Sequence, residues 1–128
     1  MPNTYSSHAI GLFVANKPGV LNRIALVFSR RGYNIDSVVA SPARDADFTH
    51  MNIIASEEKE TLDQILKQLN KLVDVVHARD YSALEKVEKE LALIKVRCSP
   101  ENRVDVMQIG HAFRGEVVDI SDSTITIQ

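Results

Sequence analysis

The sequence has no tryptophan and little aromatic content of any kind. Its four phenylalanines and three tyrosines make up only 5% of the 128 residues. Proteins that bind single-stranded nucleic acid stack bases on aromatic side chains and surround them with a basic surface. The formal net charge here is −2, so no basic field attracts a phosphate backbone. These scarcities argue against a nucleic-acid-binding protein.

Cysteine and long apolar runs are also scarce. Cys98 is the one cysteine, so no intrachain disulfide can form, and a reducing compartment such as the cytoplasm is expected. No apolar run approaches the roughly 20 residues that span a bilayer. The polar start at residues 1–7 does not resemble a signal peptide. We expect a cytoplasmic protein without a membrane partner.

Residues for catalysis or metal binding do not gather in the sequence. None of the histidines has a second histidine or a cysteine at the spacing of a zinc site; they are His8, His50, His77 and His111. Two of them, His50 and His77, are predicted to occupy ordinary sheet-face positions. The glycine-rich motifs of dinucleotide-binding and P-loop proteins are missing as well. We therefore expect neither a metal nor a cofactor in this chain, and no catalytic residues.

Strong hydrophobic periodicity fills the first 80 residues. Strands are predicted over 8–15, 33–40, 48–56 and 73–79, and helices over 18–31 and 57–72. This order matches the α+β ferredoxin-like plan, βαββαβ, with a four-stranded antiparallel sheet and both helices on one face. We assign residues 1–80 to this domain.

A charged segment at 81–90 is predicted to be a linker, after which the pattern starts again. Residues 91–128 predict a strand over 91–98, a helix that begins with Ser99 as cap and Pro100 in first position, and strands over 116–120 and 124–127. This is an incomplete β-α-β-β domain. Its third strand is expected to have an unpaired edge and an uncovered face. We consider three explanations: a partner protein covers them, this half of the chain is mobile, or the chain is shorter than the natural design.

The loop Asn16–Leu21 lies between the first strand and the first helix. Pro18 suits a first helical position, and Gly19 allows another group to approach the backbone closely. A helix start has free N–H groups and a partial positive charge, so it favours an anion. The plain alternative is turn chemistry alone. Asn34 favours a ligand site, because an amide side chain is not required in a β-branched strand.

Several segments resemble one family in the right order. They are Asn16–Leu21, FSRRGYNIDS at 28–37, QLNKLVDV at 68–75, ELALIKV at 90–96, FRG at 113–115 and VDIS at 118–121. The loop alone resembles many ACT domains. The second and fourth segments resemble the small, regulatory subunit of acetolactate synthase (acetohydroxyacid synthase) much more specifically.

The resemblance implies a homodimer in which ACT domains pair side by side and an effector binds at their interface. The implied effector is valine or another branched-chain amino acid. The implied effector-binding residues are Asn16, Lys17, Pro18, Gly19, Val20, Leu21, Asn34 and Ile35. Backbone N–H groups of 19–21 would hold the carboxylate, and Asn34 would come from the neighbouring chain.

The resemblance also implies a partner, the catalytic large subunit of acetolactate synthase. That subunit carries thiamine diphosphate, Mg²⁺ and FAD. The small subunit raises its activity and confers feedback inhibition by valine in branched-chain amino acid biosynthesis. The alternative is a stand-alone ACT-domain amino-acid sensor without a catalytic partner. An enzyme or RNA-binding module on the same fold is disfavoured by the missing site residues and aromatics.

Overall fold

The computed structural model describes residues 6–128 as two compact units, which divide between Glu85 and Lys86. Most of the polar N-terminal segment lies outside the described residues. Within the described part of the chain, no helix is long and apolar enough to cross a membrane.

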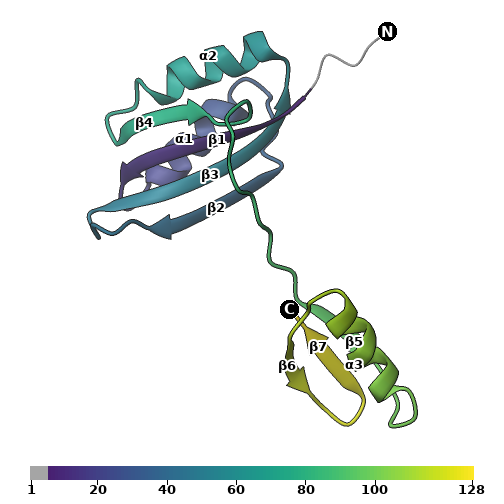
Figure 1. The fold of residues 1–128 in the computed structure, drawn as a ribbon. Helices are drawn as coiled ribbons and strands as arrows, with labels where there is room; N and C mark the ends of the chain where they lie inside the picture. The colour runs from purple at the N-terminus through teal and green to yellow at the C-terminus, as the bar shows by residue number, and fades with distance from the viewer. Residues whose placement is uncertain (1–5) are drawn as a thin grey trace, which may run out of the picture. The chain divides into compact units, whose positions relative to one another are not determined.

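The strands and helices of the first unit follow the predicted order (Figure 1). Its elements are β1 (Ser6–Ala15), α1 (Val20–Ser29), β2 (Ser37–Pro42), β3 (Phe48–Glu57), α2 (Lys59–Leu69) and β4 (Val75–Asp80). The strands lie in the order β2-β3-β1-β4, and each neighbouring pair is antiparallel. This topology confirms the predicted ferredoxin-like βαββαβ fold.

Alternation along the central strands builds the core. Every second residue of β1 faces the helices, and Ile10, Leu12 and Val14 are at most 2% exposed. The helices cover them with apolar stripes whose buried members are Val20, Ile24, Val27 and Phe28 in α1 and Leu62, Ile65 and Leu69 in α2. Both helices therefore share one core with one face of the sheet.

On the opposite face of the sheet, aromatic rings gather around Phe13. Its ring centroid lies 4.8 Å from that of Phe48, 5.1 Å from His50 and 5.7 Å from His77. Register pairs Phe13 with His50 on β3 and with His77 on β4, so all these side chains share one face. The prediction that His50 and His77 are sheet-face residues is confirmed.

The start of α1 differs from the prediction. The helix begins at Val20, and Pro18 and Gly19 belong to a turn that precedes it. Gly19 has φ 84° and ψ −8°, a left-handed conformation that cannot continue a right-handed helix. Pro18 is therefore not the first helical residue.

The start of β2 also differs, because the strand begins at Ser37 and not at residue 33. Gly32 takes φ 72°, and the Tyr33 N–H donates to the Phe28 carbonyl at 3.0 Å, which closes the end of α1. Pairing with β3 begins where the Asp36 N–H donates to the Ile54 carbonyl at 2.8 Å. Asn34 is thus a loop residue, and the argument that placed it in a β-branched strand was wrong.

The second unit contains β5 (Ile94–Arg97), α3 (Arg103–Ala112), β6 (Val117–Ile120) and β7 (Thr124–Ile127). This β-α-β-β order is the predicted one. The sheet order is β5-β7-β6, so the third strand, β7, is central and paired on both sides. The expectation of an unpaired edge on that strand was wrong, because a return strand in this topology lies between its predecessors.

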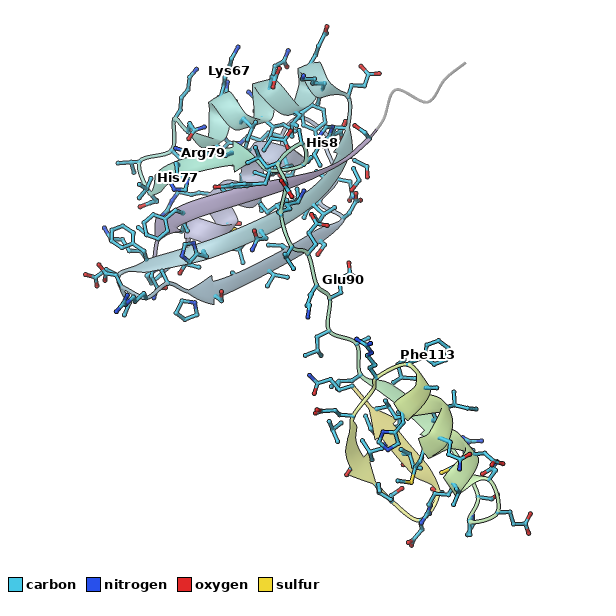
Figure 2. The ribbon with its side chains drawn as sticks, in the orientation of Figure 1. His8, Lys67, His77, Arg79, Glu90 and Phe113 are labelled. Atoms are coloured by element: carbon cyan, nitrogen blue, oxygen red, sulfur yellow. The ribbon has the colours of Figure 1, made fainter. Side chains whose placement is uncertain are left out.

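The cap of α3 also needs correction. The Ser99 N–H donates to the side-chain Oδ1 of Asn102 at 2.7 Å, and Asn102 is the residue that precedes the helix. The predicted cap at Ser99 was therefore displaced by three residues. Large apolar side chains of this unit stay exposed, among them Ile94, Ile109 and Phe113, which is labelled in Figure 2.

A partly buried polar cluster holds the end of β4 to β1. Asp80 accepts hydrogen bonds from the Ser82 N–H at 2.9 Å and the Ser82 hydroxyl at 2.5 Å. His8 Nδ1 lies 3.5 Å from the other carboxylate oxygen, and His8 is only 8% exposed. Burial acts to raise the pKa of Asp80, but the Ser82 hydrogen bonds and His8 outweigh it, so the net pKa lies below its ordinary value of 3.8.

We expect Asp80→Asn to lower stability at pH 7 by about 1 kcal/mol, because the amide loses charge-assisted hydrogen bonds. A lowered carboxyl pKa gives stability that is present above pH 3.8 and is lost as the pH falls through the folded-state pKa. The difference in the free energy of unfolding between wild type and variant should therefore shrink at low pH. Urea unfolding from pH 7 down to pH 3 measures this, with the exposed Asp63→Asn as control. A difference that does not change with pH would contradict the role of the charge.

Candidate functional site

The loop after β1 is fixed to the turn between β2 and β3 by Asn16. The Asn16 N–H donates to the Asp47 carbonyl at 2.8 Å, and its side-chain Nδ2 donates to the Ala46 carbonyl at 2.9 Å. The amide nitrogen of Asn16 thus has a structural partner within the chain. Its side-chain oxygen is the group that remains to meet a ligand.

Gly19 then turns the chain into α1. The Val20 N–H donates to the Lys17 carbonyl at 3.4 Å, and the Arg23 N–H donates to the Gly19 carbonyl at 3.0 Å. Among the described residues, no acceptor is found for the N–H groups of Leu21 and Asn22. Two free donors at the positive end of a helix dipole suit a carboxylate or another small anion.

Arg23 adds a full positive charge beside this helix start. A Cβ built on Gly19 would lie 2.9 Å from its Nη1 atom, so the guanidinium lies against the glycine. Asp74 holds it in place, because Arg23 Nε and Nη2 lie 2.8 and 2.6 Å from the Asp74 Oδ2. The helix start is therefore flanked by an Arg23–Asp74 ion pair.

Sequence reasoning missed this ion pair. Arg23 follows Gly19 by about one helical turn, and that spacing could have flagged it as a neighbour of the loop. Asp74 is 51 residues further along the chain. No local pattern connects it with the loop; only the position of β4 beside β1 brings the two together.

The side chains of the predicted loop residues face in different directions. Val20 is 4% exposed and packs in the core, so it can offer a ligand only its backbone. Leu21 is 51% exposed and is available as an apolar contact. Lys17 and Pro18 are exposed on the loop before the helix.

Asn34 belongs to a second polar group, at the other end of α1. Its Nδ2 donates to Asp36 Oδ1 at 2.8 Å, and the Ser56 hydroxyl donates to Asp36 Oδ2 at 2.8 Å. Asn34 is exposed, while the neighbouring Ile35 is half-buried and packs against the core. Among residues 6–128 no hydrogen-bond partner is found for the side-chain oxygen of Asn34, so it can accept a hydrogen bond from a ligand.

One chain does not bring the two halves of the predicted site together. Asn16–Leu21 lies at the start of α1, and Asn34 and Ile35 follow its end. A helix of ten residues is about 15 Å long. A site that contains both halves therefore needs a second copy. The edge strand β2 begins directly after the Asn34 segment, and all six of its residues are exposed.

Two family models match the chain. The AHAS small subunit-like ACT domain matches residues 10–77, and the small subunit of acetolactate synthase matches residues 89–128. The first match contains the loop, the Arg23–Asp74 pair and the Asn34 segment.

Relatives and solved structures agree with these matches. The acetolactate synthase small subunit of Mycolicibacterium smegmatis is 40% identical over 128 residues, covering 100% of this chain and 75% of that protein. A probable acetolactate synthase small subunit of Methanothermobacter thermautotrophicus is 39% identical over 123 residues, covering 95% of this chain and 73% of that protein.

A crystal structure of an acetolactate synthase small subunit from Thermotoga maritima superposes with a TM-score of 0.86 at 35% identity. The match covers 95% of this chain and 76% of that one. An ACT domain from a GTP pyrophosphokinase of Chlorobium tepidum is similar in fold alone, with a TM-score of 0.55, 23% identity and 70% and 100% of the two chains covered. The ferredoxin-like fold, the two family matches and the relatives that match 95–100% of this chain lead to one conclusion: the chain belongs to the family of acetolactate synthase small subunits, whose N-terminal part is an ACT domain.

Proposed function

We propose that this regulatory subunit binds valine or another branched-chain amino acid and passes that signal to the catalytic large subunit of acetolactate synthase. The observation that carries the proposal is the start of α1, where the free N–H groups of Leu21 and Asn22 lie beside Arg23. Family membership supports the catalytic partner.

In this proposal the effector carboxylate accepts hydrogen bonds from the free N–H groups of Leu21 and Asn22, whereas the Val20 N–H, one of the donors predicted over 19–21, already donates to the Lys17 carbonyl. Its ammonium group is held by amide oxygens of Asn16 and of Asn34 from a second copy. Leu21 and Ile35 contact the branched side chain of the effector. Leu21 is half exposed and Ile35 is half-buried, so both apolar side chains have surface that a ligand can reach. Lys17, Pro18 and Val20 shape the loop around the ligand.

The second copy docks through β2, so that two four-stranded sheets join edge to edge. An exposed edge strand offers a row of unpaired N–H and C=O groups for such pairing. The dimer then contains two symmetric effector sites, each with a loop from one copy and an Asn34 segment from the other.

Regulation follows from linkage. If the amino acid binds one interface state more tightly than another, it shifts the assembly toward that state. We propose that the chain raises the activity of the catalytic subunit and that valine reverses this gain. This chain itself is non-catalytic. Thiamine diphosphate, Mg²⁺ and FAD belong to the catalytic subunit, and the pair works in the cytoplasm.

The competing function is a stand-alone amino-acid sensor with the same loop. It differs from the proposal in one respect only, the absence of a catalytic partner. The match of residues 89–128 to the acetolactate synthase small subunit favours the regulatory subunit, because a sensor needs only the ACT domain.

Valine at about 100 times its Kd should stabilise the first unit by roughly 2.7 kcal/mol, which raises its melting temperature by several degrees. Gly19→Asp should abolish this shift, because a second carboxylate occupies the anion site. Gly19→Asn is the matched control: it has the same shape and a similar tolerance of φ 84°, but no charge. Equal valine shifts in the Asp and Asn variants would contradict a carboxylate site at the helix start.

Val39→Lys on β2 should weaken the homodimer and with it valine binding, because a lysine on an edge strand opposes edge pairing. Val76→Lys on β4 is the control: both valines are exposed, at 60% and 56%, but they lie on opposite edges of the sheet. Sedimentation of both variants across a dilution series measures the dissociation constant of the homodimer. Dissociation of the Val76 variant alone would place the interface on β4.

Mixing the chain with the catalytic subunit of the same organism tests the function as a whole. We expect acetolactate formation to rise about fivefold or more, the lower end of ordinary allosteric coupling, and valine to remove the increase. No change in rate at saturating small subunit, in a preparation that still shows the valine-induced melting shift, would leave the stand-alone sensor as the function.

A further inference from the structure

A basic groove runs between α1 and α2, and one of its lining residues, Arg23, also lies against Gly19 of the loop. One hollow of about 620 Å³ is lined by Arg23, Leu26, Val27, Arg30, Arg31, Gln68, Lys71 and Leu72. A second, of about 900 Å³, adjoins it and shares Arg31, Gln68 and Lys71 with the first. Lys67 on α2 lines the second hollow (Figure 2).

The cations of this groove are largely uncompensated. Arg23 is paired with Asp74, but among the described residues no ion pair reaches Arg30, Arg31, Lys67 or Lys71. Asp63 and Asp80 also line the second hollow, and Asp80 is bonded to Ser82. The groove is thus a strongly positive strip on a chain whose net charge is −2.

The helix dipoles account for part of the strip. Cations are favoured in the last turn of a helix, and Lys67 occupies that place in α2. Arg31 and Lys71 lie two residues beyond Ser29 and Leu69, the last residues of α1 and α2, where the negative end of each dipole also favours a cation. Arg23 lies in the first half of α1, where the dipole disfavours a positive charge. The dipoles therefore favour the cations at the helix ends, whereas Arg23 depends on Asp74 for its compensating charge.

We propose that this groove binds an acidic surface segment of the catalytic subunit. The inference rests on the proposed function, because it requires that subunit as partner, and it names the surface by which the two proteins meet. Each hollow alone has the volume of a whole small-molecule site, roughly 300–1,000 Å³. Arg30, Arg31 and Lys71 are all exposed. An extended, open and basic groove of this kind matches a carboxylate-bearing chain segment better than a single small anion.

Leu26 and Leu72 supply the apolar floor of the groove, and both are half-buried. Apolar residues at the centre and charges at the rim are the usual anatomy of a protein interface. Of the residues that the structure describes, no aromatic side chain lines either hollow, so they offer no platform for base stacking. These two features favour an acidic protein segment over a nucleic acid.

The test is a charge reversal with a matched control. Arg31→Glu with Lys71→Glu changes two groove cations, and Arg44→Glu with Lys59→Glu changes one arginine and one lysine of the same unit outside both hollows. Each substitution changes the charge by two units, so both double variants move the net charge from −2 to −6. Only the position of the change differs.

Binding of each protein to the catalytic subunit is measured at 0.05 M and 0.5 M salt. We expect the groove variant to bind about tenfold more weakly than wild type at low salt and the control to stay within about twofold. The wild-type affinity should fall at high salt, and that of the groove variant should fall less, because fewer attractive charge pairs remain to be screened. Unchanged valine-induced melting shifts in both variants show that each one is folded.

Equal affinity of the groove variant and the control would overturn the groove as the contact while leaving the proposed function intact. Failure of the wild-type chain to bind the catalytic subunit at either salt concentration would overturn both. Tight binding of a short DNA or RNA duplex by wild type, lost in the groove variant, would assign the strip to nucleic acid and also overturn the inference.

Discussion

The antiparallel pairing of β1 with both β3 and β4 is the constraint on which the other features depend. It buries the helix-facing residues of β1, Ile10, Leu12 and Val14, completely, and so fixes where the two helices can pack. It also decides where the chain leaves the sheet. The strand β1 ends beside both the β2–β3 turn and the start of β4. Asn16, in the loop after β1, therefore bonds to the β2–β3 turn, and Arg23, at the start of α1, bonds to Asp74 just before β4. The candidate site is a consequence of that central strand.

Periodic patterns predicted most of the fold, because burial on one face repeats every two residues in a strand and at helical spacing in a helix. The alternation of residues 8–15 identified β1, and the stripe through Leu62, Ile65 and Leu69 identified α2. Element ends were harder to predict. Pro18 reads as a helix start by propensity, yet the left-handed turn at Gly19 moved the start to Val20. Backbone geometry at one glycine overrode a preference that holds on average.

The candidate site was predictable only where its residues are consecutive. The loop Asn16–Leu21 could be found because glycine and proline mark it in the sequence. Asn34 was identified as unusual for the wrong reason, since it lies in a loop and bonds Asp36 instead of interrupting a strand. The Arg23–Asp74 pair could not be predicted, because its members are 51 residues apart and each alone resembles an ordinary surface charge. Long-range ion pairs leave no periodic trace in a single sequence.

Arg23 connects the two surfaces proposed for this protein. Its guanidinium lies against Gly19 at the effector loop, its side chain lines the groove between α1 and α2, and Asp74 compensates its charge. In the proposed function, an effector carboxylate at the start of α1 would compete with Asp74 for this guanidinium, and so would the proposed acidic segment in the groove. Binding at one surface would then change the free energy of binding at the other, by an equal amount in both directions. This shared residue offers a physical route by which an amino acid at the loop would alter the affinity for a catalytic partner.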